Sequence, residues 1–421
     1  MKWRYFWLGI GSVLAIIVVA WWASIPSPPE LSSRNLSRLA AALGLTLLWG
    51  QYLLASRVKV LERGLGQDRL LRLHRWFGRF ALGLVTIHFA LILYSDIATA
   101  GTVFVNTSRL LGLASLIALS ITALVASFNR QLGLRYETWK GLHLLNYFIF
   151  PVLLVHVFSA APRTPLFYAY ALIAVGYAFL FGHRALGLYR VRRNPYRVAG
   201  VIREAEDIWS VHFEGPPLLH LPGQYMHVQL LRDGQLSSSH PFTISSAPGA
   251  DRVSITPKEQ GDFTATIGRT RIGDTAYIDA PYGVFSYHYH PPEDRKVFVA
   301  GGIGITPFMS MLRDMRNRDP EHPVLLLWGN QSESYLCFRE ELKAMESQMP
   351  SLETIFVMSR QPDWPGETGN IDAELIARYA GEIPTCRFYI CGPPAMLRAL
   401  LGELEKLAVP ANRIHYEIFE L

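Results

Sequence analysis

The stretch LRLHRWFGRFALGLVTIHF, residues 71–89, contains two histidines in a segment otherwise apolar enough to cross a lipid bilayer. His74 and His88 are fourteen residues apart, and at 100° per residue this spacing returns to within ~40° of the same helix face. Polar groups are costly inside a membrane and usually mark a pathway or a bound group. The stretch therefore predicts a membrane helix whose two histidines mark a pathway or contact a bound group at two depths of the bilayer.

Apolar runs of membrane-spanning length crowd the first 190 of the 421 residues. A membrane helix needs ~20 apolar residues, and six segments meet this length: residues 5–24, 36–56, 74–95, 109–128, 141–160 and 166–187. The first segment is open to interpretation as a secretory signal peptide. Its apolar core exceeds the usual ~7–15 residues and ends in a tryptophan pair suited to an interface, which favours a retained helix.

Lysine and arginine gather in alternate loops of this half. They lie near the start of the chain and in residues 57–75, 130–140 and 190–193, whereas the loops between carry few. Positive loops stay on the cytoplasmic side, so we expect a multi-pass cell-membrane protein with both termini and the soluble half in the cytoplasm. The net charge of +6 follows from these residues facing anionic lipid and does not indicate a nucleic-acid partner.

A second histidine pair lies in WKGLHLLNYFIFPVLLVHVF, residues 139–158, on the fifth span. The third and fifth spans run in the same direction, so His143 is level with His74, and His156 is level with His88. Neutral imidazole is a good iron ligand, and a haem between two helices takes one imidazole on each face. The pattern predicts two bis-histidine haems, one above the other in the membrane.

The alternative is that these histidines are packed polar residues without a ligand, which is common for a single intramembrane histidine. Four at matched depths favour ligation. A spacing of thirteen misses the starting face by ~140° on an ideal helix, and we expect a kink at Pro151 to correct this. His183, near the cytoplasmic end of the sixth span, has no partner at its level.

From about residue 194 the sequence is typical of a soluble domain, with charged residues throughout and frequent Pro and Gly residues that interrupt the apolar runs. Cys337, Cys386 and Cys391 are the three cysteines, and their spacing gives no disulfide framework, zinc site or iron–sulfur site, which suits a reducing cytoplasm. Alternating runs such as YMHVQLL and RVSITP predict a small antiparallel barrel over residues 194–291, and residues 295–421 read as an α/β nucleotide-binding domain. The fold class is thus multidomain, with a six-helix transmembrane bundle over residues 1–190.

The run KVFVAGGIGITPFMSMLRDM, residues 296–315, reads as a strand, a glycine-rich turn and a helix. Gly301, Gly302 and Gly304 would let the backbone approach a pyrophosphate at the helix N-terminus, where free N–H groups favour anions. A tight structural turn is the alternative, because the spacing differs from the usual dinucleotide fingerprint.

Three motifs occur in a fixed order: HPFTISSAP at residues 240–248, GGIGITPF at residues 301–308 and YICGPPAM at residues 389–396. Together they resemble the ferredoxin–NADP reductase superfamily across residues 195–421. The six-span, four-histidine half resembles the ferric reductase transmembrane domain. The whole chain therefore resembles the prokaryotic NADPH oxidase and ferric reductase family.

The resemblance implies roles for particular residues. Cys391 would pack beside the nicotinamide without acting as a nucleophile, Phe419 in YEIFEL would stack on the flavin, and Arg360 in VMSRQP would pair with the 2′-phosphate unless it is a solvated surface arginine. The superfamily often has Arg where this chain has His240. The implied cofactor-binding residues are His240, Pro241, Phe242, Thr243, Ser245, Ser246, Gly261 and Thr264 for FAD, and Gly301, Gly302, Gly304, Thr306, Pro307, Ser359, Arg360, Cys391, Gly392 and Pro393 for the nucleotide.

The function that follows is electron transfer from NADPH, with NADH as the alternative donor, through FAD and two b-type haems to an acceptor across the membrane. An oxidase that reduces O₂ to superoxide is the leading hypothesis, since the outer loops offer few metal ligands beyond Glu30 and Asp96. A ferric reductase acting on a ferric chelate, a donor to a quinone or partner protein, and a non-enzymatic haem-binding scaffold are the alternatives. Arg109 is the candidate to orient the acceptor, unless it is an interfacial arginine. No feature demands an obligatory protein partner.

Overall fold

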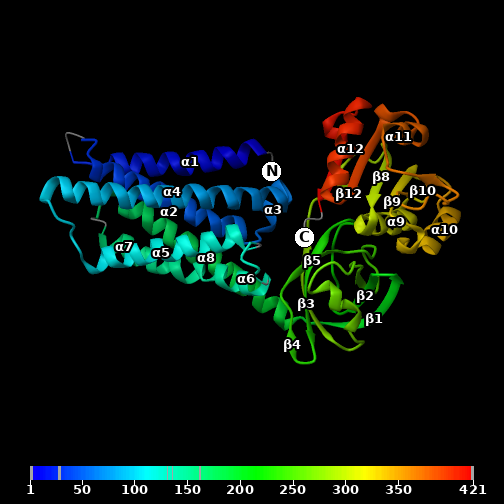
Figure 1. The fold of residues 1–421 in the computed structure, drawn as a ribbon, viewed down its shortest axis with the longest axis horizontal. Coiled ribbons are helices and arrows are strands. Elements are labelled where there is room, and N and C mark those ends of the chain that lie inside the picture. The colour runs from blue at the N-terminus through cyan, green and yellow to red at the C-terminus, as the bar shows by residue number, and fades with distance from the viewer. Residues whose placement is uncertain (1–2, 27–29, 130, 135, 161–162, 419–421) are drawn as a thin grey trace. The chain divides into compact units, whose positions relative to one another are not determined.

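The computed structural model describes residues 3–26, 30–129, 131–134, 136–160 and 163–418. It divides into two units, Met1–Leu188 and Tyr189–Leu421. The first unit is made of helices, and both sheets belong to the second (Figure 1).

Six helical segments in the described residues of the first unit have the length and composition to cross a membrane, as predicted. They are α1 (Trp3–Trp22), α2 (Ser33–Ala55), α4 (Gln67–Ala100), α5 (Thr107–Phe128), the consecutive pair α6 (Tyr136–Leu144) and α7 (Asn146–Ala160), and α8 (Pro165–Arg193), with a short helix α3 (Lys59–Leu65) before α4. The structure extends the third span to 34 residues, so α4 begins well before His74.

Helix α2 is the most buried of the spans, and small residues allow α4 to approach it closely. A Cβ atom on Gly44 would lie 2.9 Å from Cγ2 of Val85, and one on Gly50 would lie 3.3 Å from the ring of Phe77. Close backbone approach at small residues is the usual basis of helix association in lipid. The α2–α4 pair is therefore the packed centre from which the histidines of α4 are presented.

The fifth span is interrupted at Leu145, between α6 and α7, and not at Pro151 alone as the sequence suggested. Pro151 lies inside α7 and has no N–H, so the carbonyl of Tyr147 four residues earlier loses its helical donor. The hydroxyl of Tyr177 on α8 donates to that carbonyl at 2.7 Å. The interruption and the proline together separate the His143 segment from the His156 segment, which resolves the thirteen-residue mismatch.

An antiparallel sheet begins the second unit. Its strand order is β4 (Gln235–Leu236), β3 (Tyr225–Arg232), β7 (Thr275–Tyr282), β1 (Tyr196–Ala205), β2 (Ile208–Glu214) and β6 (Val253–Ile255), with β5 (His240–Thr243) also paired to β3. Alternate residues Met226, Val228 and Leu230 of β3 enter the core, as the period of two requires. Ile267, from the short 3₁₀ helix η1 (Thr264–Arg269), packs in the same core.

A parallel sheet forms the rest of the second unit. Its strand order is β11 (Glu367–Thr368), β10 (Leu352–Met358), β9 (Val324–Asn330), β8 (Arg295–Gly301), β12 (Cys386–Gly392) and β13 (Ile414–Ile418). Phe298 packs with α9 (Thr306–Arg318) and α10 (Arg339–Gln348) on one face, whereas Val297 packs with α11 (Ala373–Ala380) and α12 (Pro394–Lys406) on the other. After β8 the chain adds β9, β10 and β11 on one side of β8, and then β12 and β13 on the other side. The strand order therefore reverses between β8 and β12. Open α/β sheets bind ligands at such a reversal, beyond the carboxyl ends of the strands.

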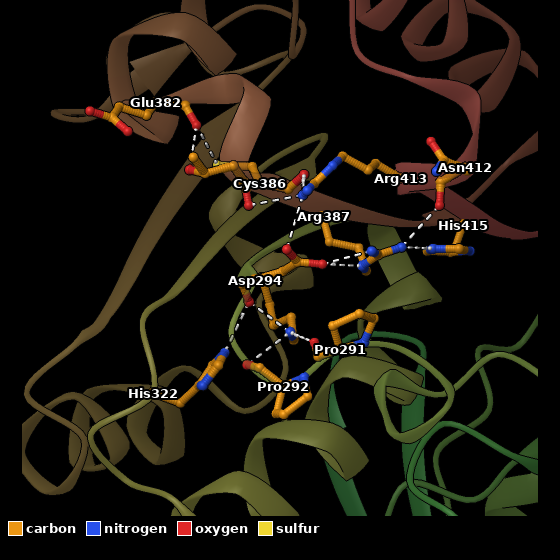
Figure 2. A network of polar contacts seen from close by, with 12 residues as sticks. Pro291, Pro292, Asp294, His322, Glu382, Cys386, Arg387, Asn412, Arg413 and His415 are labelled. Carbon is orange, nitrogen blue, oxygen red and sulfur yellow. Dashed lines mark hydrogen bonds and ion pairs between the residues drawn. The ribbon is translucent and has the colours of Figure 1, made fainter.

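A polar network joins the segment before β8 to the starts of the parallel strands (Figure 2). Asp294 accepts hydrogen bonds from Arg387 Nε at 2.7 Å and from Arg413 Nη1 at 3.0 Å. The buried Lys296 ammonium donates to the carbonyls of Pro291 and Asp294, at 2.8 and 2.6 Å. These contacts fix the connection between the two sheets at the amino edge of the parallel one, away from the edge that binds ligands.

We expect Asp294→Asn to destabilise the second unit at pH 7 by ~1–3 kcal/mol, because two arginines lose a charged acceptor. Burial alone would raise the pKa of Asp294, but the hydrogen bonds and charges of Arg387 and Arg413 lower it below its ordinary value. A lowered carboxyl pKa stabilises the fold above the unfolded pKa, and this stabilisation is lost as the pH falls through the folded pKa. The gap between wild type and variant, measured by urea unfolding, should therefore narrow below about pH 4.

The exposed Asp251 provides the control, since Asp251→Asn should change neither the stability nor its pH dependence. A gap between wild type and Asp294→Asn that stays constant down to pH 3 would contradict this account of Asp294.

Candidate functional site

The glycine turn after β8 meets the end of β12 with almost no space between the two backbones. A Cβ atom on Gly304 would lie 2.2 Å from the carbonyl oxygen of Cys391, and one on Gly392 would lie 3.1 Å from the Cα of Gly301. The buried Thr306 then begins α9, and its hydroxyl donates to the Ile303 carbonyl at 3.1 Å. The predicted glycines thus come together at the sheet's topological switch point, in front of a helix N-terminus.

Two prolines mark the helix starts on either side of this point. Pro307 lies in the first turn of α9, and Pro393 immediately precedes α12. Proline's fixed φ suits both positions, and its missing N–H costs no helical bond there.

Cys391 is fully buried near the carboxyl end of β12. Burial raises the pKa of its thiol well above the ordinary value, with the Glu417 charge adding to the effect, so the thiol stays protonated and is not a nucleophile. Glu417 pairs with Cys391 in the parallel register of β13 and was not identified from the sequence. Phe419 itself lies outside the described residues.

The carboxyl ends of β9 and β10 carry the residues expected at the 2′-phosphate. Ser359 donates through its hydroxyl to the Asn330 carbonyl at 3.1 Å, and the exposed Arg360 lies 3.4 Å from Gln331 Oε1 through Nη1. The buried Asn330 Nδ2 makes no hydrogen bond in the described part of the chain. The unbonded Asn330 Nδ2 could donate a hydrogen bond to a ribose or phosphate oxygen of a dinucleotide at the carboxyl end of β9.

Strand β5 presents the first predicted flavin residues. The His240 ring stacks on Phe263, with ring centres 4.2 Å apart and planes 13° apart, and Phe242 lies 6.0 Å from the same ring. Pro241 lies between them on β5. The buried Thr243 Oγ1 has no hydrogen-bond partner among the described residues, so this strand offers a flavin aromatic surfaces and one open hydroxyl.

Ser245 and Ser246 are occupied by protein partners. Ser245 Oγ lies 3.0 Å from Thr256 Oγ1, and its carbonyl accepts from Arg313 on α9 at 2.5 Å. The Ser246 carbonyl accepts from Ser310, also on α9, at 2.7 Å. The two serine hydroxyls thus bond to the segment of β6 and Thr256, and the two serine carbonyls bond to α9.

Gly261 and Thr264 form a local turn at the start of η1. The Thr264 hydroxyl oxygen accepts from the Gly261 N–H at 3.0 Å and from the Gln260 N–H at the same distance. Gly261 and Thr264, both predicted near the pyrophosphate, are therefore bonded to each other, and Thr264 would have to rotate for either to contact a ligand.

The four membrane histidines face one another in two pairs. The ring centres of His74 and His143 are 5.9 Å apart, and those of His88 and His156 are 6.4 Å apart. An imidazole nitrogen lies ~2 Å from a bound metal ion, so two imidazoles on opposite sides of one iron have ring centres roughly 6 Å apart. Both pairs fit two-sided ligation of a haem iron.

The first comparison with known proteins concerns family models. Residues 40–154 match the ferric reductase like transmembrane component, residues 194–291 match an FAD-binding domain, and residues 298–401 match the oxidoreductase NAD-binding domain. The fold and these matches define a membrane-associated, NAD(P)H-dependent flavoprotein oxidoreductase. This fused order of domains is the arrangement of the NADPH oxidase and ferric reductase family.

Individual relatives resemble mainly the second unit. Flavohemoproteins of Bacillus subtilis and Bacillus cereus are 26% and 28% identical over 238 and 237 residues, which cover 54% and 52% of this chain and 59% and 58% of theirs. The chain therefore spans under two thirds of the curated relatives it matches. A flavohemoglobin from Malassezia yamatoensis, solved with bound FAD and heme, has a TM-score of 0.51 at 16% identity and covers 93% of this chain and 99% of its own, a likeness of fold alone.

We expect Gly304→Ala to lower the rate of NADPH-driven flavin reduction by ~5-fold to ~100-fold, because a Cβ there displaces the backbone of Cys391, and overpacking of this kind costs ~1–3 kcal/mol. Gly402 is the matched control, since a Cβ there meets nothing within 4 Å and Gly402→Ala should leave the rate unchanged. Anaerobic stopped-flow absorbance of the flavin measures both variants. Equal rates in Gly304→Ala and wild type would show that the close approach is not needed.

Proposed function

We propose that this protein moves electrons from NADPH through FAD and two b-type haems across the membrane to O₂, giving superoxide. The observation that carries the proposal is the presence of two facing histidine pairs at different depths of one helical bundle. FAD accepts a hydride and supplies single electrons, and haem iron carries them one at a time.

Within this proposal the protein's own residues position the nucleotide and the flavin and keep water away from the nicotinamide. Gly301, Gly304 and Gly392 let the nucleotide's pyrophosphate approach the start of α9. Cys391 keeps the site beside the nicotinamide apolar, because its thiol is protonated and buried. His240 and Phe242 present rings to the flavin from β5.

Arg360 is the residue we propose for the choice of NADPH over NADH. Arg360 is exposed just after β10, and its Nη1 lies 3.4 Å from Oε1 of Gln331, the residue that follows Asn330. A guanidinium fork matches a phosphate dianion geometrically, which NADH lacks at the 2′ position.

The proposed orientation places both termini and the second unit in the cytoplasm. The arginines of residues 57–75 and 190–193 support it, because positively charged loops stay inside. His88 and His156 then form the pair nearer the outside.

The choice of O₂ over a ferric chelate rests on the groups at the outer end of the bundle. Asp96, one of the two acidic candidates there, is fully buried and forms ion pairs with Arg109 and Arg34. Arg109 also donates to the Phe104 carbonyl at 2.7 Å. The carboxylate is therefore committed to arginines and not offered to iron, and Arg109 is held in place by Asp96.

Replacing His156 tests the haem assignment. We expect purified His156→Ala protein to hold about half the haem of wild type per chain, because only the outer level loses a ligand, as measured by the pyridine haemochrome assay. His183→Ala, at an exposed histidine of α8, should retain both haems. Full haem content with an unchanged bis-histidine spectrum in His156→Ala would disprove the pairing.

The acceptor is tested by mixing the anaerobically reduced full-length protein with O₂ or with ferric citrate in a stopped-flow instrument. We expect faster haem reoxidation with O₂, together with superoxide detected as dismutase-sensitive cytochrome c reduction. Outer-sphere transfer is the expected route, because two imidazoles leave iron no open position. Slow reoxidation by O₂ and fast reoxidation by ferric citrate would establish a ferric reductase instead.

A further inference from the structure

Both outer histidines are held by a serine on a neighbouring helix, and the two arrangements match contact for contact. His88 Nδ1 lies 3.0 Å from the carbonyl of Ser37 on α2, and His156 Nδ1 lies 2.7 Å from the carbonyl of Ser108 on α5. Each serine hydroxyl donates back to the main-chain carbonyl of its histidine, at 3.1 and 3.2 Å.

The chemistry of these contacts determines where the imidazole protons lie. A carbonyl oxygen only accepts, so Nδ1 of His88 and of His156 must carry the proton and donate it. The serine hydroxyl oxygens, 2.8 and 3.2 Å from the same nitrogens, act as second acceptors. The neutral ring then has its lone pair on Nε2, the form that ligates a metal.

Packing restricts the ring of His156 as well. A Cβ atom on Gly112, one turn after Ser108 on α5, would lie 2.7 Å from Cε1 of that ring. Only a glycine leaves room for the imidazole in its bonded position, so α5 both anchors the ring and accommodates it.

The inner pair has no such symmetry. His74 lies against Gln51 of α2, whose side-chain amide group lies 3.0 Å from His74 Nδ1. The buried Nδ1 of His143 makes no hydrogen bond to any described residue. The two levels thus present different partners to histidines of the same type.

We propose that Ser37 and Ser108 are a matched pair of positioning residues for the ligands of the outer haem. Their main-chain carbonyls set the tautomer of His88 and His156, and their hydroxyls, which contact both Nδ1 and the main-chain carbonyl of each histidine, hold the ring orientation. The proposal rests on the proposed haem function. Partners of this kind orient a ligand histidine and increase its basicity, and their loss typically weakens metal binding ~10–100-fold. Only the outer level has this matched arrangement, so removing the hydroxyls affects one haem of the two.

The test compares full-length wild type, the double variant Ser37→Ala/Ser108→Ala, and Ser115→Ala. Ser115 is the matched control, because it is a buried serine of the same helix α5 whose hydroxyl has no hydrogen-bond partner in the described chain. The readouts are the low-spin electron paramagnetic resonance signals of the two oxidised haems and the rate of haem loss to an excess of apomyoglobin. The His156→Ala variant assigns which signal belongs to the outer haem.

In the double variant we expect the outer signal to shift or broaden while the inner signal stays unchanged. Outer haem should be lost up to ~10-fold faster, the lower end of the range for partners of ligand histidines, because the main-chain carbonyls still accept from Nδ1. Ser115→Ala should match wild type, and Ser37→Ala/Ser108→Thr should recover part of the wild-type signal because one hydroxyl is restored. Ser108→Ala alone, at a half-buried position, should show a smaller change of the same kind, which keeps the test open if the double variant does not fold.

Two results distinguish a failure of the proposed haem function from a failure of the proposed role of Ser37 and Ser108. Wild-type protein that binds no haem would overturn the proposed function and this inference with it. Wild-type protein with two haems, in which the single and double serine variants match Ser115→Ala in both signals and rates, would leave the function standing and overturn the role of the serines.

Discussion

The need to satisfy polar groups buried in an apolar bundle is the constraint on which the membrane half depends. In lipid, a backbone or side-chain polar group without a partner costs several kcal/mol, and the structure meets this demand through particular contacts between helices. The Tyr177 hydroxyl donates to the carbonyl that Pro151 leaves without a helical donor. The main-chain carbonyls of Ser37 and Ser108 accept hydrogen bonds from Nδ1 of His88 and His156. The contacts that satisfy these buried polar groups in lipid also orient the rings of His88 and His156.

The soluble half depends on a different constraint, the close approach of two strand ends. Gly304 against Cys391 and Gly392 against Gly301 bring β8 and β12 together where the strand order reverses. The polar network around Asp294 lies at the opposite edge of the same sheet. The ion pairs around Asp294 and the close glycine contacts therefore lie at opposite edges of the parallel sheet.

The surroundings of two buried groups act on them through different causes. Cys391 keeps its proton because it is sealed from water, whereas Asp96 forms ion pairs with Arg109 and Arg34 at the end of the bundle. In each case the environment determines what chemistry the group can offer. An apolar thiol suits contact with a nicotinamide, and an occupied carboxylate is withheld from metal binding.

The sequence by itself determined the class of architecture and the residues that come to the sites. Six apolar runs of sufficient length, a change to alternating strand patterns near residue 194, and a strand–glycine–helix run are local signals, and local periodicity reports them directly. The matched depth of His74 with His143 and of His88 with His156 followed from helix rise and direction alone. Ser37, Ser108 and Glu417 were missed because each acts on a residue distant in sequence or on another element, and single-chain periodicity does not say which faces meet. Tertiary packing likewise decided the break at Leu145 and the bonding of the Ser245 and Ser246 carbonyls to α9. Buried carbonyls and hydroxyls bond to whichever partner a neighbouring element brings within reach.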